Sequence, residues 1–231
     1  MPADYLLLLP GMMCDARLWA PQMNTLAVDC RVPDTTSADN FADMAAMVLA
    51  DAPERFAVAG LSMGGILAFE LWRQAPERIS HLALIDTNPH ADTPGKRTMR
   101  LDQIEQVLSG QLRALAVDSL KPAYLARAHR DDKELLGRIL DMAMELGEDV
   151  FRRQSLALKD RVDSVATLPT ITCPATVMCG IEDHICPVDY HQLMADRIPG
   201  ARLLVIEDCG HLASLEQPRI VTDALRQLLE Q

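Results

Sequence analysis

The sequence predicts an α/β fold in which helices cover both faces of a doubly wound, mostly parallel sheet of about six strands. Three observations support this prediction. Short runs rich in Leu, Val and Ile recur between longer segments with helical periodicity, as expected for parallel strands joined by crossover helices. One long stretch in the middle of the chain carries helical patterns alone. The 231 residues suffice for one sizeable core but are few for two independent domains.

The expected strands are the short apolar runs. In chain order they cover residues 5–9, 30–32, 56–60, 81–86, 176–180 and 202–206. The helices between them are recognised by an apolar face. Asp39 or Asn40 can cap a helix whose apolar side chains share one face, namely Phe41, Met44, Met47 and Val48. The last helix, residues 218–229, repeats this pattern with Ile220, Val221, Leu225 and Leu228.

The strand signal disappears between residues 87 and 170, where helical patterns follow one another. These patterns cover residues 97–108, 111–119, 122–128, 133–146 and 149–158. Pro89 and Pro169 flank the block and are plausible boundaries for an inserted unit. We therefore expect a helical lid insertion at residues 88–170, over an α/β core formed by residues 1–87 and 171–231.

Composition restricts the classes of partner. The chain carries 22 Lys and Arg against 33 Asp and Glu, which gives a formal net charge of −11. Binding to nucleic acid or to an anionic membrane needs a basic face, so this charge argues against both as partners.

The sequence shows no secretory signal and no run of the roughly 18 apolar residues that a membrane span needs, which predicts a cytoplasmic protein. The six cysteines are scattered through a chain without a secretory signal, so we expect free thiols. None of them forms a CxxC pair, which argues against a structural zinc site.

The segment Gly60-Leu61-Ser62-Met63-Gly64 fits the pattern G-x-S-x-G. It lies between a predicted strand and a helix that opens at Gly65. Glycines on both sides allow a sharp turn that exposes the serine hydroxyl above the sheet edge, where the helix points its free amides. Ser62 is therefore the candidate nucleophile. A tight turn without chemistry is the alternative interpretation.

A serine hydroxyl is a weak nucleophile at neutral pH and needs a base. Of the six histidines, His211 directly follows the last predicted strand, at the carboxyl end where open α/β sheets build their sites. The base needs a carboxylate that orients it, and Asp183, just beyond the strand at 176–180, is the first candidate. The alternatives at nearby positions are Asp86, Glu182 and Asp208.

Backbone amides complete the predicted site. A tetrahedral intermediate needs such donors aimed at its oxygen. The residue after the nucleophile, Met63, can supply one amide. The second is assigned to Met12, in the turn that follows the first predicted strand. The alternative is that Pro10 and Gly11 form an ordinary turn.

The chain order Ser62, Asp183, His211 resembles that of the α/β-hydrolase superfamily, and the similarity covers nearly the whole chain. The resemblance is to its small lidded esterase branch, which includes the pimeloyl-acyl-carrier-protein methyl ester carboxylesterase. The matching segments are Leu9-Pro10-Gly11-Met12, Gly60-Leu61-Ser62-Met63-Gly64-Gly65, Ala75-Pro76-Glu77-Arg78, Leu84-Ile85-Asp86-Thr87, Gly180-Ile181-Glu182-Asp183 and Cys209-Gly210-His211.

The resemblance implies that the lid inserts after the sixth strand of the family's sheet. The chain departs from the family pattern in two ways. Pro10-Gly11 stands where the family usually has His-Gly at the oxyanion turn. The strand hairpin that usually precedes this turn is missing, which implies a sheet trimmed at its N-terminal side.

Together these residues predict a serine hydrolase that cleaves a small or medium carboxylic ester through an acyl-enzyme. This chemistry requires neither a metal nor an organic cofactor. The expected partner is the small-molecule ester. The same triad could instead perform carbon–carbon bond hydrolysis, lyase or perhydrolase chemistry, because a fold does not determine the reaction. From a different class, the chain could be a non-catalytic small-molecule binding protein.

Overall fold

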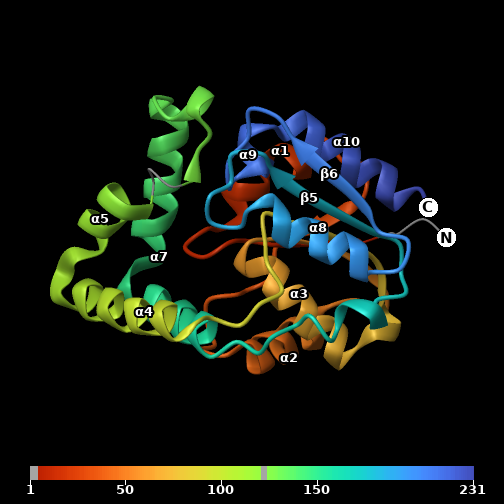
Figure 1. Ribbon diagram of the computed structural model, residues 1–231, viewed down its shortest axis with the longest axis horizontal. Helices are drawn as coiled ribbons and strands as arrows, with labels where there is room; N and C mark the ends of the chain where they lie inside the picture. Colours follow the sequence, from red (N-terminus) through yellow and green to blue (C-terminus); the bar gives the residue numbers. More distant parts are fainter. Residues whose placement is uncertain (1–4, 121–123) are drawn as a thin grey trace.

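A computed structural model describes residues 5–120 and 124–231 (Figure 1). At its centre lies a six-stranded sheet with the order β2-β1-β3-β4-β5-β6, in which every neighbouring pair is parallel. The strands are β1 (Tyr5–Leu9), β2 (Asp29–Arg31), β3 (Phe56–Leu61), β4 (Ile79–Ile85), β5 (Ala175–Gly180) and β6 (Arg202–Ile206). The predicted fold class is confirmed, and the strand ends differ from the predicted ones by at most two residues.

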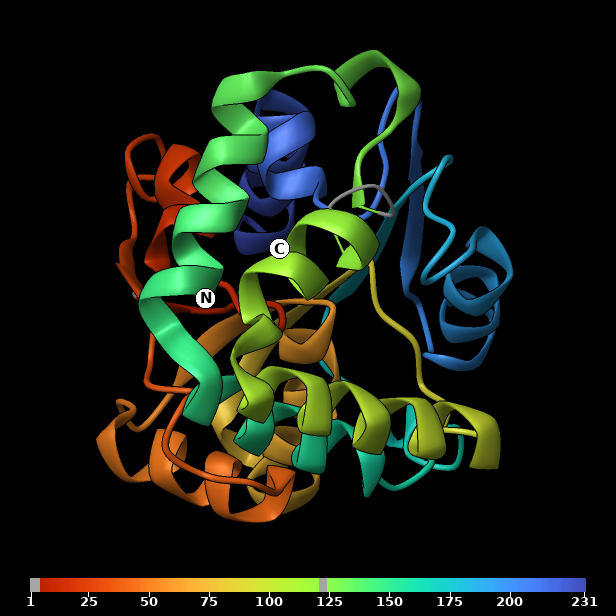
Figure 2. The same ribbon diagram turned by 90° about the vertical axis from the view of Figure 1, so that its left-hand side faces the viewer.

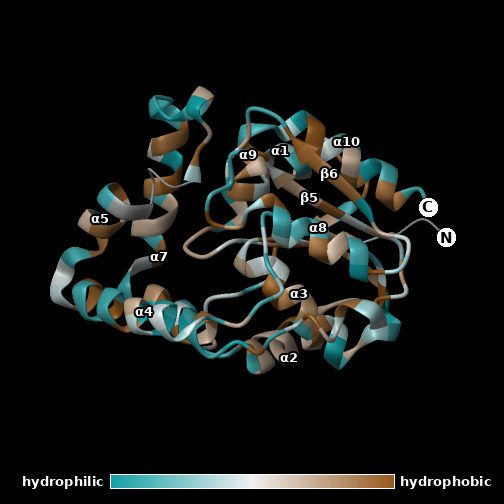
Figure 3. Cartoon of the chain, viewed as in Figure 1, coloured by the Kyte–Doolittle hydropathy of each residue, from teal (hydrophilic) through white to brown (hydrophobic). Residues whose placement is uncertain are grey.

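Alternation along the strands builds a core on each face of the sheet. Leu7 and Leu9 of β1 point to one face, and Leu6 and Leu8 point to the other. The helices on the first face are α2 (Phe41–Asp51), α3 (Met63–Gln74) and α8 (Val188–Arg197). Those on the second face are α1 (Ala20–Met23), α9 (Ala213–Glu216) and α10 (Pro218–Leu229). Hydrophobic and hydrophilic residues alternate along α10, as expected for a helix with one buried side (Figure 3).

Between β4 and β5, the described residues form mostly helices, which lie beside the sheet and face the viewer in Figure 2. Its helices are α4 (Pro94–Gln106), α5 (Leu112–Leu115) and α7 (Lys133–Lys159). They share a small core with Met13, formed by Ile104, Val107, Leu112, Leu115, Ala143, Val150 and Phe151. This helical segment therefore packs against the turn that follows β1.

The predicted helices of this segment differ from the observed ones in four places. The one at 97–108 is observed as α4, which begins at Pro94 and ends at Gln106. Those at 133–146 and 149–158 form the single element α7, which is interrupted at Gly147, where φ is 79°. The one at 111–119 is observed as α5 followed by a wider π-helical turn at Ala116–Leu120. The start of the one at 122–128 lies outside the described residues, and its end is a 3-10 turn at Arg127–His129.

Short helical turns connect several of these elements. They are Ala16–Trp19, Pro76–Arg78, Val107–Gln111, Ala116–Leu120, Arg127–His129 and Leu168–Thr170. Among the described residues, no helix has the length and apolar character that crossing a membrane requires.

Candidate active site

Ser62 occupies a strained turn between β3 and α3, with φ 56° and ψ −114°. Such a backbone conformation is costly for a residue with a side chain and persists only where the surroundings impose it. The flanking glycines make the turn possible. A Cβ on Gly60 would lie 2.3 Å from the carbonyl oxygen of Gly64, and one on Gly64 would lie 2.1 Å from the carbonyl oxygen of Leu9. The G-x-S-x-G pattern is therefore explained by close backbone approach on both sides of Ser62.

The structure brings Ser62, His211 and Asp183 into one hydrogen-bonded chain. His211 Nε2 lies 2.8 Å from Ser62 Oγ, and His211 Nδ1 lies 2.8 Å from Asp183 Oδ2. The second oxygen of Asp183 accepts hydrogen bonds from the amides of Ile185 and Cys186 at 2.8 and 2.9 Å. The Asp183 side chain is fully buried. A carboxylate held in this way can orient the imidazole and stabilise its protonated form.

Among the alternative acids, Asp86 has a different set of partners. Its two carboxyl oxygens accept hydrogen bonds from the amides of Gly180 and Ala213, at 3.0 and 2.9 Å. It thus joins the turn after β5 to the segment that follows His211. Burial, together with repulsion by Asp183, raises the pKa of Asp86 to about 8. Asp86 is therefore suited to holding the two loops together.

In the described part of the chain, neither Glu182 nor Asp208 forms a hydrogen bond or ion pair with the His211 ring. Glu182 forms an ion pair with Arg127 at 3.2 Å. Asp208 adopts a left-handed backbone conformation with φ 49°, and its carbonyl oxygen accepts a hydrogen bond from Gln217. Of the four carboxylates that the sequence suggested, Asp183 is the one placed against His211.

The two predicted oxyanion residues, Met12 and Met63, come from different parts of the chain that meet at the cavity of Ser62. Met63 is the first residue of α3, and Met12 lines the same pocket as Ser62. Among the hydrogen bonds of the described residues, the amides of Met12 and Met63 have no protein acceptor. The turn that carries Met12 is fixed by Gln154 of α7, whose side chain accepts from the Met13 amide at 2.8 Å and donates to the Thr35 carbonyl at 3.2 Å.

Glu216 is a buried carboxylate that sequence reasoning missed. It accepts hydrogen bonds from the amides of Ala126, Gly210 and Leu212 at 2.7, 3.0 and 3.1 Å. It therefore fixes the backbone on both sides of His211 and links it to the helical segment. The His211 amide adds a second link, because it donates to the Tyr124 carbonyl at 2.6 Å. No local motif announces this role, since the first of these amides is far from Glu216 in the sequence.

Replacement of Glu216 by alanine is expected to lower the free energy of unfolding by about 3 kcal/mol, because several buried amides lose their acceptor. Urea unfolding followed by circular dichroism measures this difference. Glu230→Ala at the exposed C-terminal end is the control and should leave the midpoint unchanged. Equal midpoints for the Glu216 variant and the wild type would contradict the assigned role.

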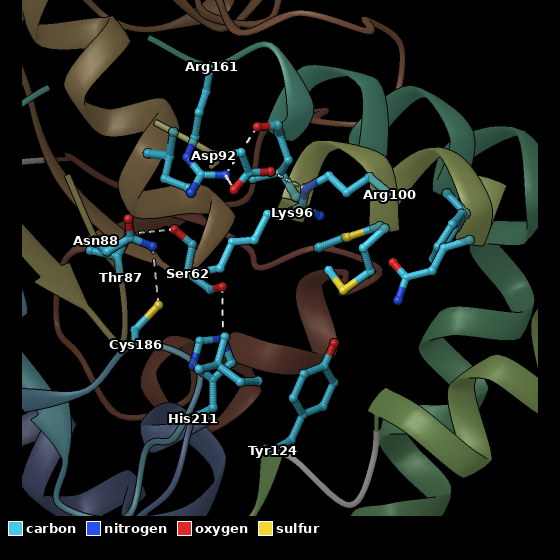
Figure 4. Close-up of a pocket in the computed structure, with 17 residues that line it drawn as sticks. Ser62, Thr87, Asn88, Asp92, Lys96, Arg100, Tyr124, Arg161, Cys186 and His211 are labelled. Carbon is cyan, nitrogen blue, oxygen red and sulfur yellow. Dashed lines mark hydrogen bonds and ion pairs between the residues drawn. The ribbon is translucent and has the colours of Figure 1, made fainter. Parts of the chain in front are cut away.

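Ser62 and His211 open into a cavity of about 190 Å³ (Figure 4). Its wall is partly apolar, with Met12, Ile66, Phe151 and Leu158 among the lining residues. The Tyr124 ring stacks on the His211 ring, with centroids 5.7 Å apart. The cavity thus combines a nucleophile, a base and an apolar wall, an arrangement that suits covalent attack on a small, partly apolar molecule.

Asp183, Cys186 and His211 place possible metal-ligating atoms within 4.8 Å of one another. A cysteine binds metal as a thiolate, but burial raises the pKa of Cys186 and keeps the thiol protonated. Both ring nitrogens of His211 are already engaged by Asp183 and Ser62. The hydrogen-bonded chain therefore accounts for this cluster. All six cysteines are free thiols, as predicted.

Comparison with known proteins finds a match between residues 6–224 and the alpha/beta hydrolase family. The pimeloyl-[acyl-carrier protein] methyl ester esterase of Pectobacterium atrosepticum is 27% identical over 237 residues, which cover 94% of this chain and 91% of the relative. Other relatives are provisionally named as a non-heme bromoperoxidase and a carbamate hydrolase.

Solved structures show the same fold. A thermophilic esterase from Thermogutta terrifontis, determined with malate bound, is similar with a TM-score of 0.90 and 27% identity, over 99% of this chain and 90% of that one. The enol-lactonase of Burkholderia xenovorans LB400 is similar with a TM-score of 0.87 and 22% identity, over 100% of this chain and 93% of that one. At that identity, the second match bears on the fold alone.

Proposed function

Because the chain belongs to the α/β-hydrolase family, we propose that it is a serine esterase that cleaves small or medium carboxylic esters through an acyl-enzyme. The observation that carries the proposal is the hydrogen-bonded chain from Ser62 through His211 to Asp183, in which Ser62 and His211 line a cavity. The esterases among the similar proteins support the same reaction class. The partner is a small-molecule ester.

In the proposed mechanism Ser62 Oγ attacks the ester carbonyl while His211 Nε2 accepts its proton. Asp183 orients the ring and offsets the positive charge that develops on it. The amides of Met12 and Met63 donate hydrogen bonds to the oxyanion. His211 then gives the proton to the leaving alcohol, and water, activated by the same ring, releases the acid from Ser62.

The helical segment acts as a lid in this proposal. Its residues Lys96, Arg100 and Phe151 line the cavity that contains Ser62. Gln154 connects α7 to the turn of Met12, so the segment also supports one of the oxyanion amides. The insertion at residues 88–170 thus encloses the substrate from the side opposite the sheet and selects it by shape and charge.

Release of p-nitrophenol from p-nitrophenyl acetate, butyrate and octanoate tests the proposal. An acyl-enzyme should give a rapid burst close to one equivalent of p-nitrophenol per chain, followed by slower steady turnover. The preferred chain length then reports the size of the acyl site. If the protein releases p-nitrophenol from none of the three esters faster than the spontaneous rate, the esterase proposal is rejected. That result would favour lyase chemistry or simple ligand binding.

The pH dependence of turnover should reflect His211. Burial disfavours its protonated form, but the charge and hydrogen bond of Asp183, helped by Asp86 and Glu216, outweigh burial and raise the pKa of His211 above its usual value of 6.5. The base must be neutral, so activity is present above this raised pKa and is lost as the pH falls through it.

The expected acid limb of kcat/KM for p-nitrophenyl acetate therefore lies above 6.5, the ordinary value for histidine. Initial rates measured from about pH 5 to pH 9 locate the limb. A limb well below that ordinary value would show that the Asp183 charge does not dominate the environment of His211.

A further inference from the structure

The cavity carries a cluster of basic side chains on the opposite side of Ser62 from His211 (Figure 4). The cluster consists of Lys96, Arg100 and Arg161, and Asp92 is the carboxylate in contact with it. The protein as a whole has a net charge of −11. A local excess of positive charge in the cavity of such an acidic protein would attract an anion that the rest of the surface repels.

Part of this cluster has a structural role. The Arg161 side chain is only 4% exposed and forms an ion pair with the fully buried Asp92 at 2.6 Å. Its guanidinium also donates to the carbonyl oxygens of His90 and Leu158, at 2.8 and 3.1 Å. Arg161 thus anchors the start of the helical segment to the end of α7, and Asp92 balances its charge.

Lys96 and Arg100 add positive charge that no second carboxylate among the cavity-lining residues balances. Arg100 uses Nε for Asp92 at 2.5 Å, and in the described residues its two terminal nitrogens have no partner. Lys96 is exposed, and no partner of its ammonium group is found among these residues. One carboxylate therefore faces three cations, which leaves about two positive charges beside the cavity.

We infer that the site takes esters that carry a carboxylate away from the scissile bond, and that Lys96 and Arg100 bind this carboxylate. The inference rests on the proposed esterase function and specifies its substrate class. A planar guanidinium and a mobile ammonium are well matched to a carboxylate, which accepts two hydrogen bonds from the first and one from the second. The apolar part of the wall, including Met99 and Phe151, would then contact the methylene chain between the two ends.

Paired substrates isolate the charge of the remote group. Monomethyl glutarate and monomethyl adipate are compared with their neutral monoamides, methyl glutaramate and methyl adipamate, by the release of methanol. The wild type should prefer at least one carboxylate over its amide by about tenfold in kcat/KM, the effect of a charge-assisted hydrogen bond. The preference should shrink in concentrated salt, because Lys96 is exposed and screened.

Charge reversal on α4 identifies the residues. Lys96→Glu should reduce the preference for the carboxylate about tenfold or more. The matched control is Arg97→Glu, the same change at the next position of α4, where the side chain is exposed and does not line the cavity. The control should keep the wild-type preference. Arg100→Gln should weaken the preference in the same direction as Lys96→Glu.

The outcomes separate this inference from the esterase proposal. Turnover of the neutral esters without any preference for the carboxylates, or an equal effect of the Lys96 and Arg97 variants, overturns the inference and leaves the esterase proposal standing. If no ester is cleaved, titration calorimetry of adipate with the Ser62→Ala variant decides the question. Binding that Lys96→Glu weakens supports the anion site, and absence of binding overturns it.

Discussion

Replacement of Ser62 by alanine is expected to lower kcat for p-nitrophenyl butyrate by about four to six orders of magnitude. The proposed acyl-enzyme needs Oγ as the attacking atom, and no other hydroxyl is hydrogen-bonded to His211 in the described structure. Residual hydrolysis would come from the oxyanion amides and from substrate binding alone. The fold should be retained, because alanine removes one polar atom and keeps the backbone of the turn.

A second serine provides a matched control for this prediction. Ser80 Oγ lies 3.1 Å from His81 Nδ1, so the chain contains another serine and histidine in contact. That pair lies near the start of β4, whereas Ser62 follows the carboxyl end of β3. Ser80→Ala should therefore keep wild-type turnover. A loss with Ser80→Ala, or full activity with Ser62→Ala, would contradict the assigned nucleophile.

The second large effect is expected for Asp183→Asn, which should lower kcat by about four orders of magnitude. Asparagine keeps the size of the side chain but favours the wrong tautomer of His211 and removes the negative charge that supports the imidazolium. The melting temperature should change little compared with kcat, since Ile185 and Cys186 can still donate to the amide oxygen.

Asp86→Asn is compared with Asp183→Asn, because Asp86 is the alternative candidate for the carboxylate that orients His211. Burial, together with repulsion by Asp183, raises the pKa of Asp86, and asparagine resembles the neutral form of the carboxyl group that burial favours. Its amide can accept from Gly180 or Ala213 but not from both, so we expect a loss of about tenfold in kcat. If the loss with Asp86→Asn exceeded that with Asp183→Asn, Asp86 would be the acid of the site.

The architecture could be predicted from the sequence because its signals are local. Apolar runs of strand length alternate with amphipathic helices, and all six strands lie within two residues of their predicted ends. The turn at Ser62 was predictable for the same reason, since glycines on both sides allow one kind of close approach. His211 could be proposed because it directly follows β6.

The choice among neighbouring carboxylates was harder to predict. Asp183 and Glu182 are adjacent in sequence, and only the path of the loop after β5 decides which one meets His211. The support from Glu216 and Gln154 could not be predicted, because their partners lie 90 and 141 residues away. Contacts of this kind depend on how the helical segment packs against the sheet, which local periodicity does not describe.

The basic cluster was missed for a related reason. Lys96 and Arg100 lie on α4, whereas Arg161 follows α7, and in sequence each looks like an ordinary surface charge. The net charge of −11 pointed away from anionic partners, because composition averages over the whole surface. A cavity can carry the opposite sign locally, and only the folded chain shows which charges line it.

Labelling with diethyl p-nitrophenyl phosphate tests the central claim most directly. This reagent transfers a diethylphosphoryl group to a serine that is activated by a neighbouring base. We expect one group per chain, located on Ser62 by tandem mass spectrometry, with no label in Ser62→Ala and strongly slowed labelling in His211→Gln. Absence of label in the wild type, or a label on another residue, would contradict the account of Ser62 as a nucleophile activated by His211.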